Sequence, residues 1–227
     1  MRVANQAIQR ERHITPTIGD LISDLNGATV FSKLDLNQGY HQLELDPESR
    51  YITTFSTHKG LRRYTRLPFG VTSAAEVFQA TIQQILDDIP GTRNISHDII
   101  IYGSDQKSHD KALEAVLQRI REKNLTLNAT KCEYHKSSIE FYGYVFSRDG
   151  VSLDPKKAEA FQQISPPQNP TEVRSLLGMA NYCSRFIPNY STITEPLRQL
   201  TKSNVTWEWT STQQAALYRY TEEVPHS

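Results

Sequence analysis

The segment Asn94–Gly103, with the sequence NISHDIIIYG, restricts the fold of this chain more than any other. It predicts a short strand, a tight two-residue turn, and a second strand that begins with Ile99, Ile100 and Ile101. The turn would present His97 and Asp98 at its tip. A hairpin of this kind is suited to hold polar groups at a fixed point, so we ask what those groups do.

The composition is that of an ordinary globular protein. The chain has 227 residues, 37% of them hydrophobic, and its formal net charge is zero. This length suits one large domain or two small ones. No apolar run is long enough to span a membrane, and the first residues lack the apolar core of a signal peptide. Cys132 and Cys183 stand in no metal-ligand spacing, so we expect reduced thiols and an intracellular protein, in the cytoplasm or the nucleus.

The charges are unevenly distributed along this neutral chain. Residues 49–75 contain five basic residues and no acidic one, and residues 107–136 contain seven basic residues against four acidic ones. Such patches can bind phosphate, although each of them can equally be a solvated surface. Zero net charge predicts that any binding to nucleic acid is weak and sensitive to salt.

Periodic patterns predict strands and helices in alternation over the first two thirds of the chain. The strand patterns fall on residues 28–36, 50–57, 125–134 and 138–147. The helical patterns fall on residues 15–27, 72–89 and 108–123. Within residues 28–36 the alternation directs Asp35 away from the side that carries Leu34 and Leu36. Asp149-Gly150 predicts a turn.

The pattern becomes helical after residue 150. Asp154-Pro155 and Asn169-Pro170 each supply a capping residue followed by proline at the first helical position. A third, shorter helix is expected around residues 193–200. We therefore place a soft domain boundary near residue 150, between an α+β part and a small helical part.

Two aspartates stand where strands end. Asp35 closes one predicted strand, and Asp98 lies in the predicted turn. Carboxylates delivered from neighbouring strands suit Mg²⁺, which prefers oxygen ligands, and paired metal ions suit phosphoryl transfer. From spacing alone the alternatives stay open, because an aspartate in a turn can be a simple turn former and Asp35 can be solvent-exposed.

Several motifs in order resemble one known family. They are FSKLDLNQGYHQLEL, RLPFGVTSAAEVFQ, the hairpin, TLNATKCEY and EFYGYVFSRDG. Together they resemble the palm of a reverse transcriptase, and more narrowly the polymerase of gypsy-type LTR retrotransposons. The segment SLLGMANYCSRFIPNYSTITEPLRQLT is similar to the connection that follows the polymerase in those Pol polyproteins. The resemblance runs from about residue 2 to residue 209.

The resemblance implies an α+β fold: a reverse-transcriptase palm, which is an antiparallel sheet backed by helices, with partial fingers, a thumb and a small helical C-terminal part. Residues 1–150 would form partial fingers and palm, residues 151–209 thumb and connection helices, and residues 210–227 a divergent tail. The implied activity is RNA-directed DNA polymerisation, the addition of dNTPs to a primer on an RNA or DNA template by two-metal phosphoryl transfer. The implied cofactor is Mg²⁺, with Mn²⁺ as a substitute, and the implied partners are primer–template and dNTPs, without a membrane.

The resemblance also assigns roles to single residues. Asp35 and Asp98 would bind the catalytic metals, and Tyr40 would lie under the sugar of the nucleotide. The templating base and the nucleotide would be lined by Leu67, Pro68, Phe69, Gly70 and Gln79. The primer's 3′ end would be gripped by Phe141, Tyr142, Gly143 and Tyr144. Read without the family, Tyr40 can be a half-buried aromatic, Phe69 part of an ordinary loop, and the aromatic segment plain core.

The hairpin departs from the family at one position. The gypsy-type branch commonly has Ile-Ser-Asp-Asp where this chain has Ile95-Ser96-His97-Asp98. His97 therefore replaces a metal-binding aspartate, which removes a negative charge and introduces a nitrogen that Mg²⁺ disfavours and Mn²⁺ or Zn²⁺ tolerates. Losing one ligand can cost on the order of 10³-fold in rate, so we expect this copy to be inactive or weak.

A second departure concerns the ends. The family's fingers begin upstream, so we expect the hairpin that binds the triphosphate to be missing before Met1, with Arg2 matching an arginine just after it. Beyond Trp209 the pattern fades within about ten residues, and we expect no ribonuclease H, integrase or protease.

Three other functions were weighed against an active polymerase. One is a catalytically inactive, polymerase-derived module that binds nucleic acid. Another is a protein-interaction module built from the helices of residues 154–200. A histidine-based hydrolase is disfavoured, because no Ser or Cys stands in a nucleophile motif.

Overall fold

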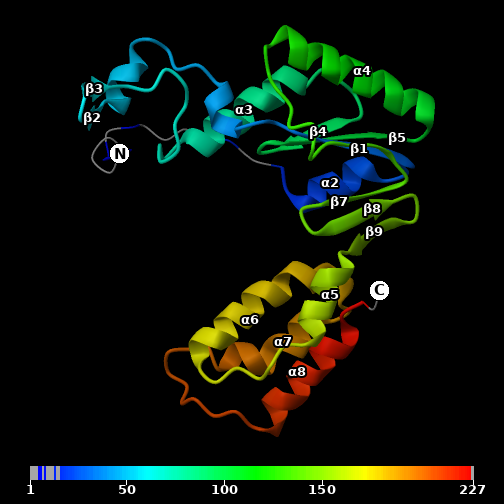
Figure 1. Cartoon of the computed structure of the whole chain (residues 1–227). Helices are drawn as coiled ribbons and strands as arrows, with labels where there is room; N and C mark the ends of the chain where they lie inside the picture. The colour runs from blue at the N-terminus through cyan, green and yellow to red at the C-terminus, as the bar shows by residue number, and fades with distance from the viewer. Residues whose placement is uncertain (1–4, 7, 9–12, 14–15, 226–227) are drawn as a thin grey trace. The chain divides into compact units, whose positions relative to one another are not determined.

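The computed structural model describes residues 5–6, 8, 13 and 16–225, so the predicted match at Arg2 lies outside the described residues. The chain divides into two compact units. The first unit comprises Met1–Ile139 with Ser147–Gly150, and the second comprises Glu140–Phe146 with Val151–Ser227. Figure 1 follows the chain from its blue N-terminal end to its red C-terminal end.

A four-stranded antiparallel sheet organises the first unit. The strand order is β4 (Thr92–Ile95), β5 (Asp98–Gly103), β1 (Val30–Asp35) and β6 (Glu133–Lys136). The two inner strands, β5 and β1, consist largely of the β-branched, aromatic and apolar residues that suit a buried strand. The hairpin predicted over Asn94–Gly103 therefore consists of β4 and β5, and β5 pairs with β1 at the centre of the sheet.

Two long helices supply the core on one face of this sheet. They are α3 (Ala74–Leu86) and α4 (Gln106–Glu122), drawn above the strands in Figure 1. Leu34, Leu36, Ile99 and Ile101 pack against their buried side chains in a single hydrophobic cluster. Because side chains alternate along a strand, Asp35 points to the opposite face, as predicted. The shorter helix α2 (Ile18–Leu25) precedes β1.

The expected strand over residues 50–57 is half wrong. Ser49–Thr53 forms a 3₁₀ turn, and only β2 (Phe55–Thr57) is a strand, paired with β3 (Gly60–Arg62). Thr53 explains the difference, since its hydroxyl donates to the carbonyl of Arg50 at 2.7 Å and accepts from the N–H of Tyr64 at 3.0 Å. Local side-chain bonds of this kind compete with the strand ladder.

The strands predicted over 125–134 and 138–147 also differ. In the first range the strand β6 begins only at Glu133, because the preceding backbone bonds the end of β1 instead: Asn128 N–H donates to the Asp35 carbonyl at 2.8 Å. The second range contains two strands, β7 (Ser138–Phe141) and β8 (Tyr144–Ser147), followed by β9 (Gly150–Leu153). Positive φ angles at the intervening residues 142 and 143 turn the chain there.

The second unit is helical after β9. Its helices are α5 (Pro155–Gln162), α6 (Pro170–Cys183), α7 (Tyr190–Gln199) and α8 (Ser211–Glu223). The predicted caps are confirmed, since the side chains of Asp154 and Asn169 accept hydrogen bonds from the first turns of α5 and α6. The helices enclose a hydrophobic core of their own. In the part of the chain described, no helix combines the length and apolar character needed to cross a bilayer.

Candidate functional site

The pairing of β1 with β5 brings the two predicted aspartates together. Asp35 lies directly opposite Asp98 in the antiparallel register. Cβ atoms of opposite residues are about 4.5–5.5 Å apart, and both side chains emerge on the same face. The N–H of Leu36 donates to the carbonyl of His97 at 2.8 Å and closes the ladder. Residues far apart in sequence thus deliver two carboxylates to one spot.

The turn itself differs from the prediction. Ser96 and His97 form the turn, whereas Asp98 is the first residue of β5 and pairs with Ile95. Ser96 takes a positive φ of 53°. Gln79 from α3 holds this turn from inside, because its Oε1 accepts from the Ser96 N–H at 2.7 Å and its Nε2 donates to the Asn94 carbonyl at 3.0 Å. Asp98 is therefore fixed by strand pairing, and His97 alone stands in the turn.

Opposite charges gather around the Asp35 carboxylate. Asp35 is only 6% exposed, and its Oδ2 lies 3.7 Å from both His97 Nε2 and Lys131 Nζ. Burial raises the pKa of Asp98, since it disfavours the charged carboxylate. The nearby Asp35 raises that pKa further, while His97, Lys33 and Lys131 lower it. Sequence reasoning missed Lys131, which the loop before β6 carries to the site.

The donor atoms of this cluster fit a divalent cation. Ligand atoms of Asp35, His97 and Asp98 lie within 4.8 Å of one another. Two carboxylates and one imidazole suit Mn²⁺ or Zn²⁺, whereas Mg²⁺ would take the two carboxylates and leave the imidazole.

A cavity of about 490 Å³ has Asp35 and His97 in its wall. Tyr40 lines it too, with its ring centroid 5.2 Å from that of Phe69 and 5.4 Å from that of Phe78. Phe78 is fully buried, whereas Phe69 is 65% exposed. The cavity therefore has an aromatic wall next to the Asp35 carboxylate, an arrangement that can seat a ring and a charged group together.

The other predicted nucleotide-binding residues occupy different environments. Leu67 and Pro68 are buried, and the Leu67 N–H donates to the Leu43 carbonyl at 2.9 Å. Gly70 is exposed with a φ of 87°. Gln79 is 2% exposed, and both ends of its amide bind the hairpin backbone. Within this predicted set, Tyr40 and Phe69 line the cavity.

The predicted primer-grip residues lie in the second unit, at the turn between β7 and β8. Phe141 and Tyr144 are buried, whereas Tyr142 is partly exposed. The hydroxyl of Tyr144 donates to the Tyr182 carbonyl at 3.0 Å, and the Tyr182 hydroxyl donates to the Tyr142 carbonyl. A Cβ on Gly143, whose φ is 77°, would collide with the Tyr182 hydroxyl. The turn is thus locked onto α6, and glycine is required there.

Most of the basic stretch of residues 49–75 is exposed, and it carries aromatic side chains. Tyr51 and Leu61 are 65% and 68% exposed. The Arg63 guanidinium lies 4.1 Å from the centroid of the Tyr51 ring, and Lys59 and Arg62 are exposed nearby on the β2–β3 hairpin. Exposed rings interleaved with basic residues can meet both bases and phosphates.

A second cluster of ionisable groups was missed from the sequence. Ligand atoms of His109 and Asp110, at the start of α4, and of His135, in β6, lie within 4.8 Å of one another. Hydrogen bonds from Gln106, His109 and His135 lower the pKa of Asp110 to about 2. Asp110 and His135 are 25 residues apart in the sequence, so no local motif predicts that they meet.

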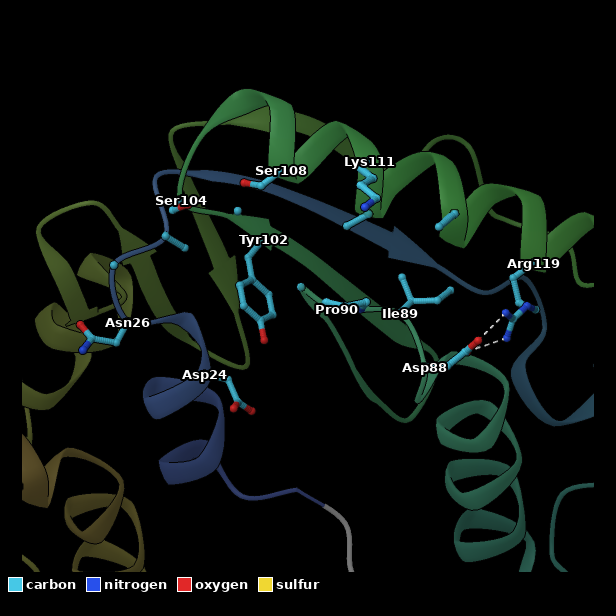
Figure 2. Close-up of a pocket in the computed structure, with 16 residues that line it drawn as sticks. Asp24, Asn26, Asp88, Ile89, Pro90, Tyr102, Ser104, Ser108, Lys111 and Arg119 are labelled. Carbon is cyan, nitrogen blue, oxygen red and sulfur yellow. Dashed lines mark hydrogen bonds and ion pairs between the residues drawn. The ribbon is translucent and has the colours of Figure 1, made fainter.

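A larger cavity, of about 620 Å³, lies at the other end of β5 (Figure 2). Tyr102 and Lys111 project into it, and an ion pair between Asp88 and Arg119 at 2.9 Å closes one side. It holds none of the site residues predicted from the sequence. Volume alone therefore does not identify the chemical site.

Comparisons with known proteins identify the family. The family model for reverse transcriptase (RNA-dependent DNA polymerase) matches residues 2–146. The Transposon Tf2-3 polyprotein of Schizosaccharomyces pombe (strain 972 / ATCC 24843) is 33% identical over 215 residues, which are 94% of this chain and 16% of that protein. The Tf2-7 polyprotein of the same organism is 32% identical over 215 residues, with the same coverage. The chain thus spans about 16% of the length of these relatives.

Solved structures are similar as well. The foamy viral protease-reverse transcriptase in complex with dsDNA has a TM-score of 0.87 and 25% identity, over 99% of this chain and 48% of that chain. The complex of the same kind of protein with RNA/DNA hybrid has a TM-score of 0.84 and 25% identity, over 98% of this chain and 31% of that chain. These matches confirm the resemblance to a retrotransposon polymerase and the α+β palm fold. With a family match over more than half of its residues, the chain belongs to the reverse transcriptase family.

Proposed function

We propose that this reverse transcriptase domain adds deoxynucleotides to a primer on an RNA or DNA template, with Asp35 and Asp98 as its metal ligands. The observation that carries the proposal is the register of β1 and β5, which sets Asp35 opposite Asp98 next to a cavity of about 490 Å³. Mg²⁺ would be the usual cofactor, and Mn²⁺ would be accepted because of the imidazole. The solved relatives bound to dsDNA and RNA/DNA hybrid support nucleic acid as the partner.

Each residue of the site has a task in this proposal. Divalent ions held by Asp35 and Asp98 would supply the positive charge that phosphoryl transfer needs at the primer hydroxyl and at the leaving phosphate. Asp35 and Asp98 hold that charge in place from two paired strands. Tyr40, braced by the buried ring of Phe78, supports the sugar of the nucleotide and leaves no room for a 2′-hydroxyl. Phe69 covers the same pocket from its exposed loop.

His97 weakens this site in our proposal. Its Nε2 lies 3.7 Å from Asp35 Oδ2, where the family has a carboxylate. The imidazole supplies at most one ligand atom and no negative charge, so cations bind less tightly and favour Mn²⁺ over Mg²⁺. A loss on the order of 10³-fold in rate is expected relative to a site with three carboxylates.

The other parts extend the proposal along the chain. Residues 1–150 would serve as partial fingers and palm, and residues 151–209 as thumb and start of the connection. The turn at residues 141–144 would grip the primer, presenting the partly exposed Tyr142. Leu67, Pro68 and Gly70 would shape the nucleotide pocket through the backbone that carries Phe69. Gln79 would act indirectly, by fixing the turn.

Primer extension on poly(rA)/oligo(dT) tests the proposal. The chain, the variant His97→Asp, and the double variant His97→Asp with Asp35→Asn are compared in Mg²⁺ and in Mn²⁺. We expect weak or no extension by the chain, a gain on the order of 10³-fold in His97→Asp, and loss again in the double variant. Equal activity of the chain and His97→Asp would show that His97 does not impair the site. Activity that survives Asp35→Asn would contradict the assigned ligands.

A second candidate is nucleic-acid binding without catalysis. The exposed basic and aromatic β2–β3 region favours it, since it needs no metal site. Fluorescence anisotropy with a labelled primer–template, measured at several salt concentrations, would detect it. Binding that weakens in Arg62→Gln, and that accompanies no extension by any variant, would support this candidate over the first.

A further inference from the structure

A histidine, an aspartate and a second histidine meet outside the catalytic cluster. His109 Nδ1 lies 3.0 Å from Asp110 Oδ1, and His135 Nε2 lies 2.9 Å from the same oxygen. The two imidazole rings are 5.1 Å apart and edge to face. His109 and Asp110 belong to the first turns of α4, and His135 belongs to the edge strand β6. A helix and a strand distant in sequence therefore share one polar contact.

We propose that His109, Asp110 and His135 form a structural site for a zinc-like divalent cation. Imidazole nitrogen and carboxylate oxygen are the non-sulfur ligands that Zn²⁺ prefers. With bonds of about 2.0–2.1 Å, tetrahedral zinc holds its ligand atoms about 3.3 Å apart. The distances from Asp110 Oδ1 to the two histidine nitrogens, 3.0 and 2.9 Å, are close to this value, and all three ligand atoms lie within 4.8 Å of one another. The mixed nitrogen and oxygen set disfavours Mg²⁺ and Ca²⁺.

Neighbouring groups orient the ring of His109 and fix the backbone of His135 for this task. His109 is fully buried, and Ser32 Oγ lies 2.9 Å from its Nε2, which leaves Nδ1 facing Asp110. The same hydroxyl accepts the backbone N–H of His135 at 3.0 Å. Metal-binding histidines are usually held through their second nitrogen in this way. Gln106 Nε2, 2.8 Å from Asp110 Oδ1, steadies the carboxylate.

The location suggests what the cation does. Strand β6 is short and pairs with β1 through Phe31–Lys136 and Lys33–Glu133, with a register shift between them. A cation held by α4 and β6 would fasten this weakly paired edge strand to the helix above it. His135 and Asp110 are both about half exposed, so an ion can reach the site from solvent without unfolding.

Zinc binding by the whole chain tests the proposal. The protein is first treated with a chelator, and Zn²⁺ binding is then measured by isothermal titration calorimetry. Co²⁺ absorption serves as a spectroscopic probe of the same site. The ligand variants are His135→Asn and Asp110→Asn. The matched control is His58→Asn on the exposed β2–β3 turn. A further variant, His97→Asn, removes the imidazole of the catalytic cluster. Circular dichroism verifies folding, and two ligand variants guard against one failing to fold.

Because the catalytic cluster also offers zinc ligands, the ligand variants are compared in the His97→Asn background. There we expect one saturable Zn²⁺ that adding His58→Asn leaves in place. Adding either ligand variant should weaken its binding at least 10-fold, since outer-shell changes alone cost 10–100-fold. Zn²⁺ should also raise the melting temperature of His97→Asn and not that of the double variant with His135→Asn. Absence of saturable binding in His97→Asn would overturn the proposal, as would binding that persists when His135→Asn is added.

Discussion

Replacing His97 with aspartate should make the stability of the fold depend on divalent cations. The new carboxylate would lie closer to the backbone than His97 Nε2, which is 3.7 Å from Asp35 Oδ2, and would still face Asp35 and Asp98. Two like charges 4 Å apart repel by about 4 kcal/mol at an effective dielectric constant of 20. Solvent at the 47%-exposed side chain and Lys131, 3.7 Å from Asp35, offset most of this repulsion. About 1–2 kcal/mol of destabilisation should remain without a cation.

Thermal unfolding in EDTA measures this cost. For a protein of this size, 1–2 kcal/mol lowers the melting temperature by roughly 2–8 °C. The matched control is His97→Asn, which removes the imidazole without adding charge and should melt close to the parent. Millimolar Mg²⁺ or Mn²⁺ should then restore the aspartate variant and stabilise the asparagine variant less, because a cation relieves more repulsion among three carboxylates than between two.

Two results would refute this reasoning. Equal melting temperatures of the two variants in EDTA would mean that residue 97 does not interact with the other carboxylates. Equal stabilisation of both variants by Mn²⁺ would mean that the cation binds without a carboxylate at residue 97. Either result would mean that a carboxylate at residue 97 adds nothing to the metal site of Asp35 and Asp98, whatever the polymerase assay gives.

Three further predictions concern packing and reactivity. Gln79→Leu should lower the free energy of unfolding by about 1–3 kcal/mol in urea titrations, because it orphans buried backbone groups; Gln84→Leu, on the exposed side of the same helix, should have little effect. Phe78→Ala should cost about 3–5 kcal/mol, whereas Phe69→Ala should cost much less and instead weaken nucleotide binding. Burial raises the pKa of Cys183 to about 11, so mass spectrometry at pH 8 should find it alkylated only after unfolding, later than the half-buried cysteine.

Local signals in the sequence predicted much of the fold. The predicted starts of α5 and α6, at Asp154-Pro155 and Asn169-Pro170, are confirmed. Such starts are predictable because the capping side chain and the fixed φ of proline act within one helical turn. Helix α8 was missed although its signal is present: Thr210 and Gln213 form a capping box, and Tyr220 buries its ring in the core. The family resemblance alone predicts only a divergent tail there.

The candidate site was predictable where the family motifs or strand alternation reached it. The placement of Asp35 and Asp98 on neighbouring strands follows from such patterns. Three other contacts depend on tertiary packing: that of Lys131 with Asp35, that of the buried Gln79 amide with the hairpin, and that of His135 with α4. A local sequence pattern does not show which loop packs against which strand end. These contacts could therefore be found only in the structure.

The isoleucine triplet of β5 cannot by itself protect the chain from misfolding by strand slippage. Ile99, Ile100 and Ile101 are all fully buried, two on the helix face of the sheet and one on the other. Sliding β5 by one residue would still bury isoleucine on both faces, so hydrophobicity hardly penalises the error. The register of β5 must instead be fixed at the turn, where the side-chain amide of Gln79 bonds the backbone of the residues on either side of Ile95. Gln79 therefore favours the strand register that places Asp35 opposite Asp98.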